Sequence, residues 1–250
     1  MTSYQGGKQR LGAKIYQAII DIEQQLSPTP LPYLDPFVGY AGVLCHFATS
    51  GRQCYATDLN PDIIEMWKGL QDGWIPEPAC SKERYEELKK SLVPSKERGL
   101  YGIVCSFGAQ FFRSYRKKSE TRDYVSTGVR KLTNAVKNMT SVSFLPAMSY
   151  EFAVTACSTP SPLLIYCDPP YRNNNISSNY FKEFDHEHFW DIIRGWSKDN
   201  IVVVSEYTAP ADFICIWKED CINNYPTGNK NTFRKKKNAD CLFIHSSDYI

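Results

Sequence analysis

Four consecutive residues, Asp168-Pro169-Pro170-Tyr171, form the part of the sequence best suited to chemistry. They directly follow Leu163-Leu164-Ile165-Tyr166-Cys167, an apolar run typical of a strand buried on both faces. A carboxylate at such a strand end, beside a backbone carbonyl in a turn braced by two prolines, can accept two hydrogen bonds from an amino group. The sequence therefore predicts a site that makes an amine a stronger nucleophile, with the Tyr171 ring available for stacking.

Two further segments end in residues that suit a ligand. Asp35-Pro36-Phe37-Val38 leads into Gly39-Tyr40-Ala41-Gly42, where small residues would let the backbone approach a ligand closely. A glycine-bearing turn without a ligand is the commoner occurrence of this pattern. Asp58 ends the next apolar segment, where an acid can accept hydrogen bonds from both hydroxyls of a ribose. Simple capping of the helix after Asn60 is an equally good interpretation of Asp58.

The elements that must position these residues alternate between strand and helix. Helical spacing of apolar residues predicts helices over 10–26, from Asn60-Pro61 to residue 70, and over 185–196 with Asp185 as N-cap. Short apolar runs predict strands over 33–38, 53–57, 163–167, 201–204, 213–217 and 241–245. This order predicts an α/β fold with an open sheet, in which ligands lie beyond the carboxyl ends of the strands.

Composition narrows the class of protein. The 250 residues are 42% hydrophobic, which is enough for a sizeable core, and no run of eighteen apolar residues or secretory signal occurs. We therefore expect a cytoplasmic, soluble protein with no membrane partner. The nine cysteines form no C-x-x-C pair, so we expect reduced, mostly buried thiols. His186-Glu187-His188 does not suit a metal, because neighbouring positions on a helix point in different directions.

A segment of different texture, residues 73–142, interrupts the α/β pattern with prolines, crowded charges and aromatic residues mixed with basic ones. We interpret 1–72 and 143–250 as one catalytic domain and 73–142 as an inserted, mainly helical recognition domain. The net charge is only +2, so binding to a polyanion must come from local clusters. The candidate nucleic-acid contacts are Gln110, Arg113, Arg116, Lys117, Lys118, Lys235 and Lys236. A charged helix face is an alternative interpretation of the residues from Gln110 to Lys118. A solvated loop is an alternative interpretation of Arg234–Lys237.

Taken together, these segments resemble the Dam-type DNA adenine N6-methyltransferases over nearly the whole chain. The resemblance rests on Tyr4-Gln5-Gly6-Gly7-Lys8, Asp35–Gly42, Asp58-Leu59-Asn60 and Asp168–Tyr171, which stand in the family's order. Three further segments are similar to bacteriophage members of the family: Cys105-Ser106-Phe107-Gly108, Phe184-Asp185-His186-Glu187 and Ser205-Glu206-Tyr207. The resemblance implies a Rossmann-like class I S-adenosylmethionine-dependent methyltransferase sheet with a helical target-recognition insert, and a virus or prophage as a plausible source.

The resemblance also implies roles for single residues. Tyr4 and Lys8 would border the methionine part of S-adenosylmethionine, Asp35 and Gly39 would shape the cofactor loop, Asp58 would hold the ribose, and Glu151 beside Phe152 would lie near the adenine ring. The cofactor-binding set is Tyr4, Gly7, Lys8, Asp35, Phe37, Gly39, Asp58, Glu151, Phe152 and Asp168, and the catalytic set is Asp168, Pro169, Pro170 and Tyr171. Ala41 stands where the family carries its second loop glycine.

The implied substrate is double-stranded DNA, from which an adenine rotates out to stack on Tyr171 and meet the cofactor. No metal is needed, because the sulfonium already activates the methyl group, and we expect a monomer or weak dimer. Three rivals stay open: a methyltransferase of the same architecture that acts on cytosine N4, RNA or protein glutamine, a nucleotide-binding oxidoreductase, and a DNA-binding relative with impaired catalysis. The oxidoreductase does not account for Asp168–Tyr171.

Overall fold

The computed structural model describes residues 7–117, 123–159, 162–172, 184–226 and 233–249. A seven-stranded sheet in the order β3-β2-β1-β4-β5-β7-β6 forms its centre. The strands are β1 Tyr33–Asp35, β2 Cys54–Ala56, β3 Val142–Phe144, β4 Leu164–Cys167, β5 Ile201–Glu206, β6 Phe213–Pro226 and β7 Phe233–His245. β3, β2, β1, β4 and β5 run parallel, whereas β7 is antiparallel to both β5 and β6.

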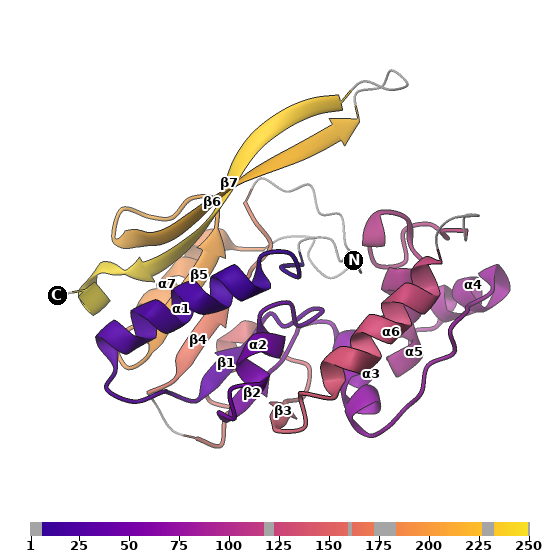
Figure 1. The fold of residues 1–250 in the computed structure, drawn as a ribbon, viewed down its shortest axis with the longest axis horizontal. Coiled ribbons are helices and arrows are strands. Elements are labelled where there is room, and N and C mark those ends of the chain that lie inside the picture. Colours follow the sequence, from indigo (N-terminus) through magenta and orange to yellow (C-terminus); the bar gives the residue numbers. More distant parts are fainter. Residues whose placement is uncertain (1–6, 118–122, 160–161, 173–183, 227–232, 250) are drawn as a thin grey trace.

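Helices cover both faces of this sheet (Figure 1). They are α1 Gly12–Leu26, α2 Leu44–Ala48, α3 Pro61–Gln71, α4 Lys82–Lys90, α5 Lys96–Val104, α6 Tyr124–Val136 and α7 His186–Trp196, with short 3-10 turns at Phe107–Ala109, Tyr150–Phe152 and Ser246–Tyr249. Alternate residues of β4 belong to two apolar clusters: Tyr166 packs in the cluster that contains Ile19 of α1, and Ile165 in the cluster that contains Phe189 of α7. Burial on both faces explains the unbroken apolar runs of the central strands.

The predicted Rossmann-like α/β sheet of the class I methyltransferase type is confirmed by this strand order and direction. Local signals also act as expected. Asn60 caps α3 by accepting a hydrogen bond from the Asp62 backbone N–H at 3.0 Å, and Pro61 takes the first helical position. Asp185 caps α7 in the same way through the His188 N–H at 3.0 Å.

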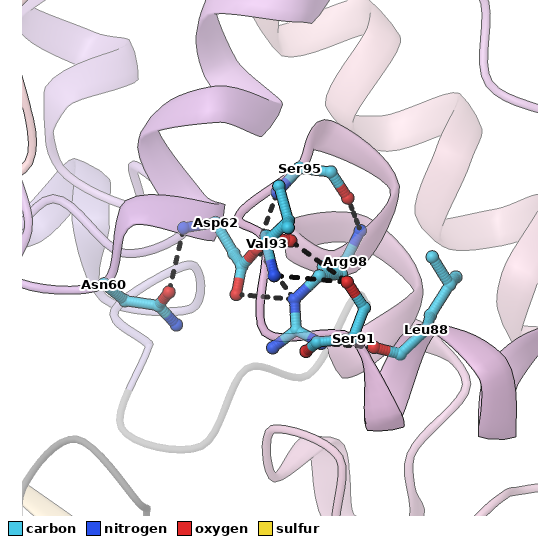
Figure 2. Close-up of polar contacts among 7 residues, drawn as sticks. All are labelled: Asn60, Asp62, Leu88, Ser91, Val93, Ser95 and Arg98. Carbon is cyan, nitrogen blue, oxygen red and sulfur yellow. Dashed lines mark hydrogen bonds and ion pairs between the residues drawn. The ribbon is translucent and has the colours of Figure 1, made fainter.

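Helices α4, α5 and α6 lie beside α3 at the β3 end of the sheet (Figure 1). Their buried residues, such as Tyr85 and Leu100, belong to the same apolar cluster as Trp67 of α3. A buried ion pair also ties α5 to α3, since Arg98 Nε donates to both carboxylate oxygens of Asp62 at 3.0 and 3.1 Å (Figure 2). The part of the chain from α4 to α6, called the helical segment below, is therefore firmly attached to α3, the helix that follows β2.

The last two strands correct one prediction. The segments predicted over 213–217 and 241–245 are parts of longer strands, which pair from Phe213↔His245 to Pro226↔Phe233 and project from the sheet as an arm (Figure 1). The run Arg234–Lys237 therefore lies within β7 and not in a solvated loop. Hydrogen bonds to β6 form this strand, and a run of charged residues carries no apolar alternation that would have indicated it.

Two expectations about composition can be compared with the described part of the chain. The eight cysteines whose side chains the structure describes are all free, and most of them are buried, as predicted. None of the described helices combines the length and the apolarity needed to cross a bilayer.

Candidate active site

Three carboxylates meet where neighbouring parallel strands end. Asp35 is the last residue of β1, Asp58 follows β2, and Asp168 follows β4, and these strands are adjacent in the order β2-β1-β4. Burial raises the pKa of Asp35 well above its usual value, and the nearby Asp168 and Asp58 carboxylates add to the rise. A pocket at this edge is lined by Gly7, Lys8, Gln9, Asp35, Phe37, Val38, Gly39, Tyr40, Gly42, Val43, Tyr166 and Asp168.

A buried ion pair lies at the centre of the pocket. Lys8 Nζ is 2.7 Å from Asp168 Oδ1, and the two side chains are 8% and 16% exposed. Burial raises the pKa of Asp168, while the Lys8 ammonium opposes the rise. The structure therefore brings together two residues that are far apart in the sequence and that the resemblance placed in one site. Asp168 keeps some exposure, so a ligand in the pocket can reach its carboxylate.

Tyr171 is fixed against the neighbouring strands. Its hydroxyl lies 2.6 Å from Ser205 Oγ on β5 and donates to Asp240 Oδ1 on β7 at 3.2 Å. Lys8 Nζ lies 4.5 Å from the centre of the Tyr171 ring, so this ring forms one side of the Lys8–Asp168 pair. Pro169 is buried and Pro170 half-buried between the two residues. The anchored hydroxyl holds the ring at a defined angle, and the side chain is 6% exposed in this structure.

The Asp58 carboxylate accepts hydrogen bonds from the backbone of the glycine turn and of the segment after β2. Its Oδ2 accepts a hydrogen bond from the Gly39 N–H at 2.9 Å, and its Oδ1 accepts one from the Asn60 N–H at 2.9 Å. Burial raises the pKa of Asp58 to about 6, and the two backbone hydrogen bonds oppose this rise. Gly39 has a positive φ of 43°, a conformation that glycine adopts without strain. Asp58 is thus both a structural acceptor for the turn and a carboxylate beside the pocket.

Phe37 and Asp35 fix the other side of the turn. Asp35 Oδ1 accepts a hydrogen bond from the Phe37 N–H at 3.1 Å. The Phe37 ring stacks on Tyr150 with ring centres 5.3 Å apart, and it also meets the rings of Phe184 and Phe189 edge-on. Phe37 therefore lines the pocket while its ring belongs to an aromatic cluster shared with α7.

Tyr40 and Ala41 explain the altered glycine pattern. Ala41 has a φ of 53°, a left-handed conformation that costs a residue with a side chain about 1 kcal/mol. The Tyr40 hydroxyl donates to the Gly99 and Leu100 carbonyls of α5 at 3.0 and 3.3 Å, so the turn is anchored to the helical segment. Sequence reasoning missed this anchor, because nothing near Tyr40 in the sequence indicates its partners.

Asp58 bonds to the Gly39 turn but does not itself line the pocket, and neither do two other predicted cofactor residues. Glu151 lies in the 3-10 turn after β3, where its Oε1 is 2.9 Å from His188 Nε2 on α7. Phe152 is 61% exposed. The resemblance-based role of both stays a prediction. Tyr4 lies outside the described residues.

Most of the predicted nucleic-acid residues follow α5. The Phe112 N–H donates to the Gly102 carbonyl at 2.8 Å and the Arg116 N–H to the Cys105 carbonyl at 2.6 Å, so this segment folds back on the end of the helix. Arg113 and Lys117 are exposed, Gln110 bonds to the Arg113 side chain, and the Arg116 guanidinium lies 3.5 Å from the Tyr124 ring centre. Lys118 lies outside the described residues. Lys235 and Lys236 lie on β7, and their side chains are outside the description.

Metal binding has no support in the part of the chain that the structure describes, where no group of three His, Cys, Asp or Glu could hold an ion. His186 and His188, which the sequence places near each other, have separate carboxylate neighbours. His188 meets Glu151 as above, and His186 Nδ1 is 4.0 Å from Glu206 Oε1.

Known proteins resemble this chain only distantly. No protein-family model matches the sequence, and a search of curated proteins finds no match. An rRNA methyltransferase from Streptomyces viridochromogenes is 12% identical, with 94% of this chain and 86% of that one covered and a TM-score of 0.37. A precorrin 8w decarboxylase from Methanobacterium thermoautotrophicum is 8% identical, with 92% and 89% covered and a TM-score of 0.40.

An S-adenosylmethionine-dependent methyltransferase from Agrobacterium tumefaciens is 10% identical, with 94% of this chain and 62% of that one covered and a TM-score of 0.39. None of these three proteins is named for an action on DNA. At such scores a likeness assigns no activity, so the function must be argued from the chain's own sheet and site.

Proposed function

We propose that this protein is a methyltransferase that uses S-adenosylmethionine and methylates N6 of an adenine rotated out of double-stranded DNA. The observation that carries the proposal is the position of Asp168. It follows the buried strand β4, begins the Asp-Pro-Pro-Tyr turn, and shares one pocket with Lys8, Asp35 and the Gly39 turn. A buried carboxylate with a raised pKa that lines a pocket is suited to interact with a substrate amine.

The edge of the sheet offers a fitting set of groups for this cofactor. Asp58 lies at the end of β2 beside the Gly39 turn, the position from which an acid accepts hydrogen bonds from ribose hydroxyls. Lys8, Asp35 and Asp168 supply opposite charges for an amino-acid end that carries both an ammonium and a carboxylate. When bound, S-adenosylmethionine supplies a methyl group on a positively charged sulfur, and the protein then has to orient the amine toward it.

Asp168 would activate the amine by hydrogen bonding. The lone pair of an aromatic amine is delocalised into the ring, which makes it a poor nucleophile. The Asp168 carboxylate and a backbone carbonyl in the Pro169-Pro170 turn would accept the two N6 hydrogens and localise charge on the nitrogen. In the described structure Lys8 occupies Asp168 Oδ1, so the substrate amine would share or replace this contact. Tyr171, anchored by Ser205 and Asp240, would support the base from its face.

The helical segment and the hairpin arm would bind the DNA. Arg113 and Lys117 are exposed cations on the segment that follows α5. Helix α5 is in turn bonded to Tyr40 of the glycine turn. Arg234–Lys237 occupy β7 of the projecting arm (Figure 1), and a two-stranded ribbon has dimensions that a major groove admits. Cations at these two places would contact phosphates, which fix the protein on the duplex while the base rotates out.

Methyl transfer to defined polymers tests the proposal. The purified protein is incubated with S-adenosylmethionine labelled in its methyl group and, separately, with unmethylated DNA, RNA and a glutamine-containing protein. We expect label in DNA alone. After digestion of the DNA to nucleosides, the label should be found in N6-methyldeoxyadenosine. Label in N4-methylcytosine, RNA or protein would assign the same architecture to another substrate, and binding of the cofactor and DNA without any transfer would indicate an impaired relative.

A further inference from the structure

The pocket beside Asp168 contains two buried polar groups that the protein itself leaves unpaired. Within the described residues four buried side-chain atoms lack a hydrogen bond, and two of these, Gln9 Nε2 and the Tyr166 hydroxyl, belong to residues that line the pocket. An unpaired polar group destabilises a protein interior, so native structures contain few of them, and each one requires a physical reason. Two in a single pocket indicate that a ligand supplies the missing partners.

Tyr166 is directed toward the site by the strand that carries Asp168. Tyr166 lies on β4, Asp168 follows two positions later directly after the strand, and both residues line the pocket. Tyr166 is 2% exposed, and burial holds its pKa well above the usual value, so the hydroxyl keeps its proton and can donate. The Ser205 hydroxyl is near enough to Tyr166 to oppose this rise in pKa, but its hydrogen bond, at 2.6 Å, is to Tyr171.

Two glycines position Gln9. A Cβ atom on Gly7 would lie 2.4 Å from Gln9 Oε1 and 2.8 Å from Nε2, so a side chain at position 7 would move the amide from its present place. A Cβ on Gly42 would lie 2.8 Å from the Gln9 backbone nitrogen, so the glycine turn also packs closely against this residue. The glycines that bear the family resemblance thus hold Gln9 in place, although the resemblance assigned Gln9 no role.

We propose that Gln9 and Tyr166 bind the amino-acid end of the cofactor, with the Gln9 amide N–H and the Tyr166 hydroxyl donating hydrogen bonds to its carboxylate. The inference rests on the proposed function and adds two residues to it. Both groups are donors beside the Lys8 ammonium, which favours an anionic acceptor, while Asp35 and Asp168 in the same pocket suit the ammonium of that end.

Binding of two related compounds tests the inference. S-adenosylhomocysteine carries the amino-acid end, and 5′-methylthioadenosine lacks it. Titration calorimetry should show that the wild type prefers S-adenosylhomocysteine, and that Tyr166→Phe and Gln9→Met each weaken this compound about tenfold while leaving 5′-methylthioadenosine unchanged. Equal affinity of the wild type for both compounds, or unaltered affinity of both variants for S-adenosylhomocysteine, would overturn the inference.

Thermal unfolding without ligand separates binding from structure. Because Tyr166→Phe removes an unpaired hydroxyl, it should leave the Tm of the ligand-free protein unchanged or raise it, while reducing the increase that S-adenosylhomocysteine causes. The matched control is Tyr85→Phe, whose equally buried hydroxyl is bonded to Ser106 at 2.7 Å, and which should lower the Tm without changing the preference between compounds. If the wild type binds neither compound, the proposed function fails. If the wild type prefers S-adenosylhomocysteine but both variants bind it as tightly as the wild type does, this inference alone fails.

Discussion

Two of the buried ion pairs in the described structure, Arg98–Asp62 and Lys8–Asp168, differ in what surrounds them. Arg98 and Asp62 join α5 to α3 with side chains 9% and 1% exposed, and their remaining groups are bonded to backbone (Figure 2). Arg98 Nη1 donates to the Leu88 and Ser91 carbonyls, and Asp62 Oδ1 accepts the Ser95 N–H at 2.8 Å. Lys8 and Asp168 instead line a pocket, with Asp168 16% exposed.

This difference separates a structural pair from a functional one. A buried pair whose hydrogen-bonding groups are satisfied fixes two helices, and breaking it leaves an uncompensated charge. A pair that lines a pocket can exchange a partner for a ligand, and burial raises the pKa of Asp168 although the Lys8 ammonium opposes the rise. Four substitutions or conditions should expose this contrast.

The largest effect is expected for Asp168→Asn. The amide cannot accept charge as a carboxylate does, so kcat should fall about a hundredfold to a thousandfold. The amide oxygen can still accept from Lys8 and Asp35 lines the same pocket, so stability should fall less than when a buried charge loses its partner outright. Methyl transfer and urea unfolding measure the two quantities. Asp191→Asn, an exposed carboxylate on α7, is the control and should keep full activity. Activity within tenfold of wild type would remove Asp168 from the chemistry.

Arg98→Met should show the opposite division. It leaves Asp62 buried without its cation, which costs about 3 kcal/mol or more in the free energy of unfolding. Urea unfolding measures this loss. The control is Arg194→Met, which removes a half-exposed partner of Asp212 and should cost about 1 kcal/mol or less. Equal losses in the two variants would contradict the structural role of the Arg98–Asp62 pair.

Cofactor binding should depend on pH through Asp58. Its pKa of about 6 means that the carboxylate is ionised above that pH and protonated below it. A ribose needs the ionised acceptor, so affinity for S-adenosylhomocysteine should be constant above about pH 6 and fall up to about tenfold per unit below it. Calorimetry between pH 5 and 8 measures this affinity. The Asp58→Asn variant should bind weakly, and its affinity should not change with pH below pH 6. An affinity that rises on acidification would refute the role of Asp58.

The smallest effect is expected for Tyr40→Phe. The variant loses the hydrogen bonds to the Gly99 and Leu100 carbonyls, worth about 1 kcal/mol, and keeps the packed ring. KM for the cofactor should rise about fivefold while kcat stays within twofold, because the turn loosens but the Asp168 site is untouched. Steady-state kinetics at saturating DNA measure both constants. A fall in kcat with an unchanged KM would place Tyr40 in the chemistry instead of the turn.

The sequence predicted the central elements because their signals are local. The apolar run before Asp168 has the composition of a strand covered on both faces, and β4 is such a strand. Asn60 and Asp185 cap the helices that they precede. Placing Asp35, Asp58 and Asp168 at one edge followed from the rule that parallel strands end on the same side.

The features that were missed depend on partners far along the chain. The Tyr40 hydroxyl finds its acceptors on α5, and Gln9 owes its place to contacts with Gly7 and Gly42. The outer half of the hairpin has charged residues on β7 with no apolar periodicity, so only pairing with β6 reveals it as a strand. The contact between Glu151 and His188 was likewise not indicated by the sequence, and the role near the adenine ring that the resemblance gives Glu151 stays a prediction.

The central claim is that Asp168 activates an adenine amine in DNA. The most direct measurement is to express the protein in a bacterium without DNA methylation and to map modified bases at single-molecule resolution, with Asp168→Asn as the control. The proposed role predicts N6-methyladenine in a defined sequence context with the wild type and none with the variant. Modified cytosine in place of adenine, or the same adenine pattern from Asp168→Asn, would contradict it.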